Sequence, residues 1–161
     1  MRIALLAAGG VTAMVTAVVY THFSAAVMPR LARLAPAEGI STMQRFNRTA
    51  VRPPFMTSFF GAAAVSAWFV YRAAGGPRSL SDLLAGAGGA AYLAGFALTV
   101  VYHVPRNNQV DAMDPADPSS WPAWNRYLRE WTKGNSVRAV LSGVAVGLFA
   151  ASAVTGAPAE L

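Results

Sequence analysis

The stretch LLAGAGGAAYLAGFALTVVYHVP, residues 83–105, contains no Asp, Glu, Lys or Arg. An α-helix needs about 20 apolar residues to cross about 30 Å of hydrocarbon. This uncharged stretch therefore predicts a transmembrane helix over residues 83–103. Three other gaps between charged residues are equally suitable: 27 residues after Arg2, 19 after Arg52 and 21 after Arg138.

These four gaps predict an all-α protein, an integral membrane antiparallel four-helix bundle with an interfacial amphipathic helix. We expect residues 1–161 to form a single transmembrane domain. The predicted spans are residues 3–28, 54–71, 83–103 and 139–155. Small residues such as Gly143 and Gly147 would let the helix backbones approach closely.

The composition supports a membrane protein. Of the 161 residues, 55% are hydrophobic and 12% are charged, whereas a soluble domain has about 25% charged residues. The absence of cysteine excludes disulfides, thiolate metal sites and a cysteine nucleophile. The sequence also lacks a Rossmann fingerprint, a P-loop, and the GxSxG and HExxH motifs.

Basic residues predict the orientation in the membrane. Ten of the 13 lie in the first and third connections between spans, and the other three are Arg2, Arg72 and Arg78. By the positive-inside rule, we expect a multi-pass protein of the plasma (inner) membrane with both termini extracytoplasmic. This topology and contact with membrane lipid explain the net charge of +6, so no nucleic-acid partner is expected.

The two cytoplasmic connections, residues 30–53 and 106–138, are amphipathic. Apolar residues in the first connection are Ile40, Met43, Phe46 and Val51. In the second, spacings of three and four place aromatic and apolar side chains on one helical face. These residues are Trp121, Trp124, Tyr127, Leu128 and Trp131. They predict a helix lying along the membrane surface, and the tryptophans either form an aromatic belt or line a pocket.

A short motif occurs twice. Met28-Pro29-Arg30 ends the first predicted span, and Val104-Pro105-Arg106 follows the third. Both motifs are followed by an aromatic-Asn-Arg triplet, at residues 46–48 and 124–126. Either a duplication of two-helix halves or chance explains the repeat.

Polar residues gather toward the cytoplasmic ends of the spans in the predicted topology. They are His22, Asn47, His103, Asn107, Asn108, Asn135 and Arg138. Polar side chains inside a membrane are costly and mark functional candidates, although hydrogen bonding between helices or solvation would also explain them. Two histidines supply at best half of a zinc or copper shell. We therefore predict no metal or cofactor, and a metal or haem held by His22 and His103 is the alternative.

Four blocks resemble the anthrone oxygenase-like family of small four-helix membrane proteins. They are Val27-Met28-Pro29, Phe46-Asn47-Arg48, the block from His103 to Asn108, and the block from Trp131 to Arg138. The chain departs from the family at His103 and Arg106, where many members have Asn and Leu. The resemblance implies oxidation of anthrones to anthraquinones, and it covers nearly the whole chain.

This chemistry suits the candidate residues. Removing a proton from the anthrone carbon opposite the carbonyl gives an enolate that reacts with dioxygen without a cofactor. His22 or His103 would be the base, and Asn107, Asn135 or Arg138 would stabilise the oxyanion. A planar, apolar slot would hold the lipophilic substrate. The expected slot residues are Phe55, Phe59, Tyr102 and Trp131, with Asn47 and Asn108 as further substrate-binding residues.

Two other classes of function remain open from the sequence. In the first, the protein is a non-enzymatic membrane subunit that docks a protein partner or lipid through its aromatic, basic connections. In the second, it is a transporter. The alternatives differ in whether His22, His103, Asn135 and Arg138 line one cavity or are saturated by hydrogen bonds.

Overall fold

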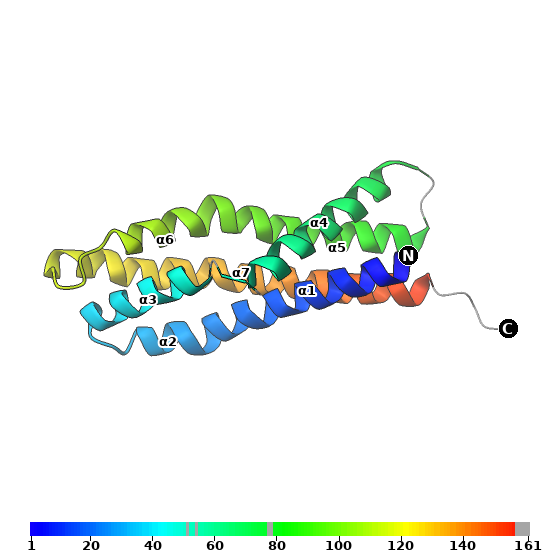
Figure 1. Ribbon diagram of the computed structural model, residues 1–161. Helices are drawn as coiled ribbons and strands as arrows, with labels where there is room; N and C mark the ends of the chain where they lie inside the picture. The colour runs from blue at the N-terminus through cyan, green and yellow to red at the C-terminus, as the bar shows by residue number, and fades with distance from the viewer. Residues whose placement is uncertain (51, 54, 77–78, 157–161) are drawn as a thin grey trace.

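The computed structural model describes residues 1–50, 52–53, 55–76 and 79–156, and these residues form helices and turns without any strand. The all-α prediction is therefore confirmed. Figure 1 shows an elongated bundle with the N-terminus and the end of the last helix at the same end. Val51 and Pro54, which belong to the predicted first connection and second span, lie outside the described residues.

Two of the long helices continue through a proline. The first consists of α1 (Arg2–His22), η1 (Phe23–Val27) and α2 (Met28–Leu31). The second consists of α5 (Leu80–Leu98), η2 (Thr99–His103) and α6 (Val104–Asp111). These composite helices contain 30 and 32 residues, so the helices do not end at the predicted boundaries near residues 28 and 103.

A π-helical turn precedes each of these prolines. The turns η1 and η2 end two residues before Pro29 and Pro105. Proline lacks an N–H and its ring clashes with the carbonyl four residues earlier in a regular α-helix. A wider turn relieves this clash and lets the helix continue. The repeated motif thus has the same local structure in both places.

The helix α7 (Trp121–Thr155) contains 35 residues and is uninterrupted. The prediction of a helix over residues 121–131 is confirmed, but this segment is the first part of α7 and not a separate amphipathic helix. Its aromatic face is buried within the protein. Trp124 is 1% exposed and Trp131 is 5% exposed, so these side chains belong to a core rather than to an aromatic belt.

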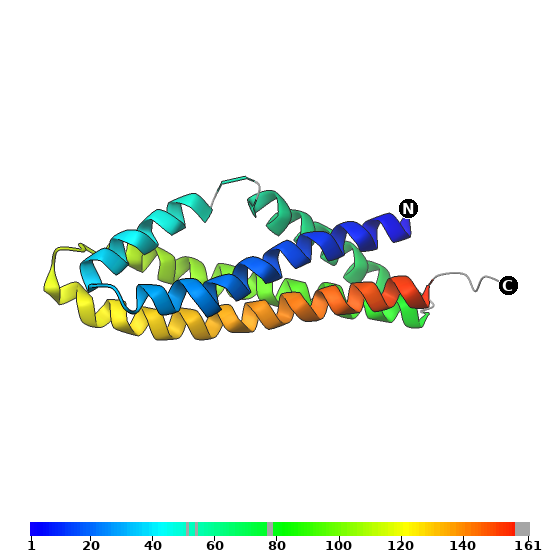
Figure 2. The same cartoon turned by 90° about the horizontal axis from the view of Figure 1, so that it is seen from below.

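The first connection forms a helix that covers this aromatic face. The helix α3 (Pro36–Ala50) packs on α2, α6 and α7 and is followed by α4 (Phe55–Ala74). The helices α3 and α4 are bent by 58° relative to each other, and Figure 2 shows this bend.

The short helix η3 (Pro118–Ser120) leads into α7. Asp117 accepts hydrogen bonds from Ser119, which lower the pKa of its carboxyl group.

The buried apolar residues form two cores along the bundle. The inner core lies among α1, α4, α5 and α7 and consists of Leu6, Ala13, Ala62, Phe69, Ala85, Tyr92, Ala145 and Phe149. The outer core lies among α2, α3, α6 and α7 and consists of Met28, Leu31, Ile40, Met43, Val110, Trp124, Tyr127 and Trp131. Because α7 contributes to both, the residues between Trp131 and Ala145 join the two cores.

The glycine at which two helix backbones approach closely is not one of the predicted pair. A Cβ atom on Gly89 would lie 2.5 Å from the carbonyl oxygen of Ser66, so α5 approaches α4 closely there. Gly143 and Gly147 have nothing within 4 Å of such an added atom. The expectation that this pair brings helices of the chain together is therefore wrong.

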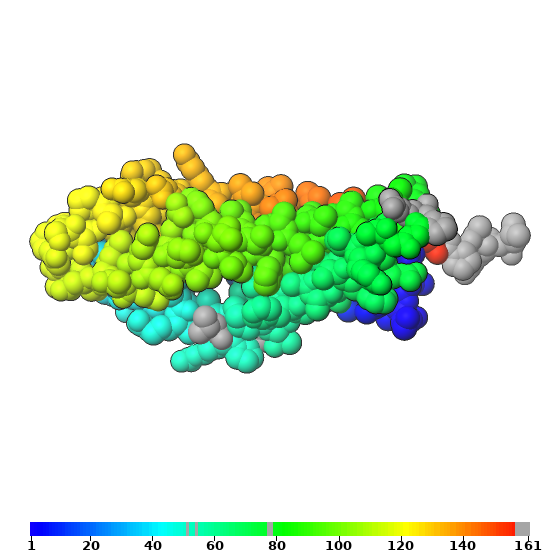
Figure 3. All heavy atoms as spheres, turned by 90° about the horizontal axis from the view of Figure 1, so that it is seen from above, coloured from blue at the N-terminus to red at the C-terminus, as the bar shows by residue number. Residues whose placement is uncertain are grey.

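Among the described residues, three helices are long and apolar enough to cross a membrane: Arg2–Leu31, Leu80–Asp111 and Pro118–Thr155. The helices α3 and α4 satisfy the same criterion only when they are taken together as one bent span. The space-filling view in Figure 3 shows the composite helix of α5 and α6 extending along the molecule, with α7 beside it.

Candidate functional site

Arg138 is a buried cation between the two cores, with 4% of its surface exposed. Its guanidinium donates to Oδ1 of Asn135 at 2.7 Å and to Oγ1 of Thr99 at 3.1 Å. The Tyr20 ring lies beneath it, with its centre 4.2 Å from Cζ. Within the described parts of the chain, no carboxylate pairs with Arg138 and its Nε has no hydrogen-bond partner. The groups that contact the positive charge of Arg138 are therefore neutral: an amide oxygen, a hydroxyl oxygen and an aromatic ring.

His103 is fully buried on the adjacent helix, at the end of η2. Neither of its ring nitrogens has a hydrogen-bond partner among residues 1–50, 52–53, 55–76 and 79–156. A buried polar group that makes no hydrogen bond costs about 1–3 kcal/mol. Such groups are uncommon in native proteins and call for an explanation, of which a catalytic role is one.

Trp131 connects His103 with Arg138. Its ring stands edge-on to the imidazole, with centroids 5.2 Å apart, and its centre is 5.4 Å from Cζ of Arg138. One turn further along α7, Gly134 leaves room for the imidazole, since an added Cβ atom would lie 2.8 Å from Nε2. The spacings from Trp131 to Asn135 and Arg138 place all three on one face of α7. The predicted grouping of His103, Asn135 and Arg138 therefore forms around Trp131.

Asn135 links this cluster to the first helix. Its Nδ2 donates to the carbonyl oxygen of Tyr20 at 2.6 Å and to Oγ of Ser24 at 2.7 Å. Its Oδ1 accepts from Arg138. Every polar atom of the Asn135 side chain is thus used, so Asn135 is suited to orienting the guanidinium of Arg138.

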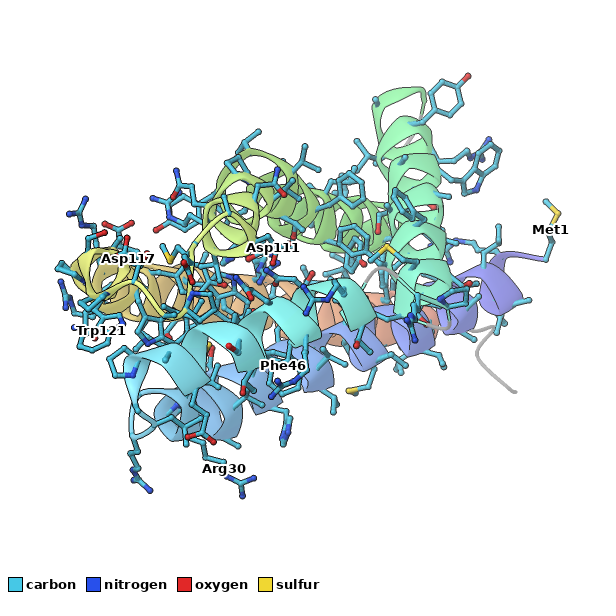
Figure 4. The ribbon with its side chains drawn as sticks, turned by 60° about the vertical axis from the view of Figure 1, so that its left-hand side comes forward. Met1, Arg30, Phe46, Asp111, Asp117 and Trp121 are labelled. Atoms are coloured by element: carbon cyan, nitrogen blue, oxygen red, sulfur yellow. The ribbon has the colours of Figure 1, made fainter. Side chains whose placement is uncertain are left out.

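Asn47 and Asn107 belong to a separate polar network near the outer core. The Asn107 Oδ1 accepts from the Tyr127 hydroxyl at 3.1 Å and from Trp131 Nε1 at 2.9 Å. Asn47 donates to Oδ1 of Asp111 at 3.1 Å. Figure 4 labels Asp111 where α6 lies beside α3. These bonds hold α3, α6 and α7 together, and Asn107 contacts the buried cluster through Trp131.

Tyr102 lies next to His103, with ring centroids 5.2 Å apart, and interacts with Arg106. The guanidinium of Arg106 lies 3.4 Å from the centre of the Tyr102 ring and donates to the Tyr102 carbonyl oxygen. It also forms an ion pair with Glu130 at 3.1 Å. Arg106, one of the departures from the family pattern, therefore ties η2 to α7.

Phe55 and Phe59 form an aromatic wall next to Tyr20. The Phe55 ring lies 6.3 Å from the Tyr20 ring and 6.0 Å from the Phe59 ring, and Phe59 stacks on Phe96 at 4.7 Å. Phe55 and Phe59 therefore pack against other aromatic rings in this structure, and their role in a substrate slot stays a prediction.

Two candidates lie away from the cluster. His22 is exposed on α1, so its predicted place on the wall facing His103 is wrong. Asn108 is exposed on α6. One of the two histidines is therefore exposed and the other is buried. No group of three His, Asp or Glu side chains suited to a metal ion occurs in the described part of the chain.

Sequence reasoning missed residues that complete the cluster, namely Thr99, Ser24 and Gly134. Thr99 lies one turn before His103, a spacing that places both on one helical side. Ser24 is a polar residue in an apolar stretch, which was a usable signal. Gly134 gave no signal, because its role depends on how closely α7 approaches η2.

A comparison with known families bears on this site. A family model described as "Anthrone oxygenase" matches residues 55–148, which is more than half of the chain. The chain belongs to the anthrone oxygenase family. The anthrone oxygenase match includes His103, Asn135 and Arg138, whereas Tyr20 and Ser24 lie before it. No curated protein and no solved structure matches the chain.

Proposed function

We propose that the protein is a membrane-embedded oxygenase that acts with dioxygen on an anthrone-like or other lipophilic polycyclic phenol. The observation that carries this proposal concerns His103 and Arg138, which are both buried. Among the described residues, neither ring nitrogen of His103 has a hydrogen-bond partner and no carboxylate pairs with Arg138. Membership of the anthrone oxygenase family supports the reaction class.

The placement in a membrane rests on the long apolar helices. The helices α1, α4, α5 and the second part of α7 would form a four-helix bundle in the hydrocarbon. Large apolar side chains are exposed on these helices, including Val18, Phe60, Leu83 and Val140. Since the composite helices exceed the roughly 20 residues that a span needs, the outer core would project from the membrane. The basic residues put that projection in the cytoplasm and both termini outside.

His103 is the proposed base. A neutral imidazole nitrogen can accept the proton from the anthrone carbon opposite the carbonyl. The exposed His22 is no longer a candidate, because it cannot share a substrate with Arg138 from the outer face of α1. His103 would subsequently return the proton to the peroxide formed at that carbon.

Arg138 is the proposed stabiliser of negative charge. Deprotonation moves charge onto the carbonyl oxygen, and a fixed cation in a dry site stabilises such an oxyanion strongly. Asn135 and Thr99 hold the guanidinium in place. Because no carboxylate neutralises Arg138 in the described structure, the enolate would be its first full counter-charge.

The reaction balances without a further redox partner. The enolate transfers electrons to dioxygen, a carbon–oxygen bond forms, and the proton held by His103 gives a hydroperoxide. Removal of the second hydrogen from the same carbon breaks the O–O bond and releases water. Anthrone and dioxygen thus give anthraquinone and water. The substrate is oxidised by four electrons when its CH₂ becomes C=O, and dioxygen accepts all four.

The second candidate function is a non-enzymatic membrane subunit. It is favoured by the burial of His103 and Arg138, which are 0% and 4% exposed, and by the close packing of Tyr20 and Trp131 around them. Access of a polycyclic substrate would require these helices to separate.

Oxygen uptake by protein in lipid vesicles, with anthrone as substrate, tests the proposal. We expect one dioxygen consumed per anthraquinone formed, with wild-type turnover well above the rate of empty vesicles. Equal rates in loaded and empty vesicles, across anthrones and related phenols, would favour the subunit.

A further inference from the structure

Two open grooves join on the surface between the first helix and α7. The groove of about 580 Å³ lies between α2 and α7, and a groove of about 390 Å³ lies between the end of α1 with η1 and the middle of α7. Ser136 lines both, so they form one continuous surface, which we call the α2–α7 groove. Its apolar lining residues are Met28, Pro29, Ala32, Leu128, Ala25, Ala139 and Val140.

The charge in the α2–α7 groove is confined to one end. Arg129 and Lys133 are exposed there, one helical turn apart on α7. Neither forms an ion pair with the described residues. The neighbouring acid, Glu130, is paired with Arg106 on another side of α7. Arg30 adds a further positive charge at this end and points away from the bundle (Figure 4).

The length of the groove matches one membrane leaflet. Arg129 and Val140 are separated by 11 residues on one helix, which corresponds to about 16 Å along the axis. One leaflet contributes about 15 Å of hydrocarbon. An acyl chain lying along Ala25, Ala139 and Val140 would therefore end near the two basic side chains, where its headgroup would lie.

We propose that the α2–α7 groove binds one phospholipid with an anionic headgroup. The phosphate lies between Arg129 and Lys133, and an acyl chain occupies the apolar part of the groove. This site rests on the proposed membrane placement but not on the oxygenase reaction. The lipid would also cover Ser24, whose hydroxyl group accepts from Asn135 and lines the inner part of the groove.

Native mass spectrometry of the full chain in detergent tests this site. The delipidated protein is mixed with equal amounts of phosphatidylglycerol and phosphatidylcholine of the same chain length. A basic residue near anionic lipid contributes about fivefold in affinity, so two predict about a 25-fold preference for phosphatidylglycerol. Replacing both charges (Arg129→Gln with Lys133→Gln) should remove this preference. Glycerol phosphate, which lacks acyl chains, should not be retained.

Two matched controls distinguish lipid binding in the α2–α7 groove from a general effect of the protein's positive charge. The pair Arg45→Gln with Arg48→Gln removes the same charge from exposed positions on α3 and should keep the preference. Ala32→Phe should abolish lipid retention by filling the groove without a charge change, whereas Ala123→Phe, exposed elsewhere on α7, should not. Equal retention of both lipids by the wild type, or equal losses in the α2–α7 groove and control variants, would overturn the proposal.

Recovery in the membrane fraction after an alkaline wash keeps the two proposals separate. If the wild type and all variants are lost from that fraction, the membrane placement is contradicted, and this lipid site is contradicted with it. Normal lipid preference together with absent oxygen uptake would overturn only the oxygenase reaction.

Discussion

Arg138 donates a 2.7 Å hydrogen bond to Oδ1 of Asn135, one turn earlier on the same helix. The acceptor is a neutral amide, so it orients the guanidinium without neutralising it. Burial of an uncompensated charge is costly, and a protein that needed only helix packing would gain from an apolar residue at this place. The relationship between these two residues therefore favours a site prepared for an anion.

Replacing the buried His103 should lower turnover while increasing the stability of the fold. We expect His103→Leu to lower turnover by about 100- to 10,000-fold. The same change should raise the free energy of unfolding by about 1–3 kcal/mol, because it removes two buried unpaired nitrogens. Oxygen uptake and thermal unfolding in micelles measure the two effects. His22→Leu, on the exposed face of α1, serves as the control and should change neither; a stability loss in His103→Leu would instead indicate a structural histidine.

Arg138 should be needed for the rate of the chemical step. We expect Arg138→Gln to lower kcat by about 100- to 1,000-fold, as the loss of an oxyanion-stabilising donor does. Arg138→Lys keeps the charge but loses the planar fork that contacts Asn135 and Thr99, so it should retain an intermediate rate. Steady-state kinetics of anthrone oxidation measure this order. If Arg138→Lys is as slow as Arg138→Gln, the positive charge at this position makes no contribution to kcat by itself.

Asn107 should stabilise the fold without taking part in turnover. Asn107→Leu removes the acceptor for the Tyr127 hydroxyl and the Trp131 indole N–H. We expect a loss of about 1–3 kcal/mol of stability and unchanged turnover per folded molecule. Asn108→Leu, the exposed neighbour, should have neither effect. A large loss of kcat in Asn107→Leu at temperatures where it is fully folded would restore the predicted substrate-binding role.

Gly134 should be required for the approach of α7 to η2. A Cβ atom there would lie 2.7 Å from Tyr102 Cε1 and 2.8 Å from His103 Nε2. We expect Gly134→Ala to cost about 1–3 kcal/mol through overpacking. Gly143→Ala meets nothing within 4 Å and should gain up to about 1 kcal/mol from helix propensity. Thermal unfolding of the two variants should shift in opposite directions, and shifts in the same direction would contradict the packing at Gly134.

Cysteine labelling tests the orientation. The chain has no native cysteine, so single substitutions report one position each. In intact cells, Gly75→Cys should react with an impermeant thiol reagent, and Ala116→Cys should react only after the membrane is opened. The reverse pattern would place the basic connections outside the cell.

The sequence predicted the helices well because charge spacing and apolar length act locally along the chain. It also identified His103, Asn135 and Arg138, since antiparallel helices bring the end of one beside the start of the next. It did not reveal that His22 faces outward, because a π-helical turn follows that residue and the first span is apolar on all sides. The burial of Trp124 depended on α3 folding back onto it, which periodicity within residues 121–131 cannot show.

The uninterrupted helix α7 has a consequence for cooperativity. Phe149 lies in the inner core and Trp124 in the outer core, and one continuous set of backbone hydrogen bonds joins them. Loss of either core would leave half of a 35-residue helix without its packing partners. The part of the protein around the inner core and the part around the outer core should therefore melt together in a single transition rather than as two independent units.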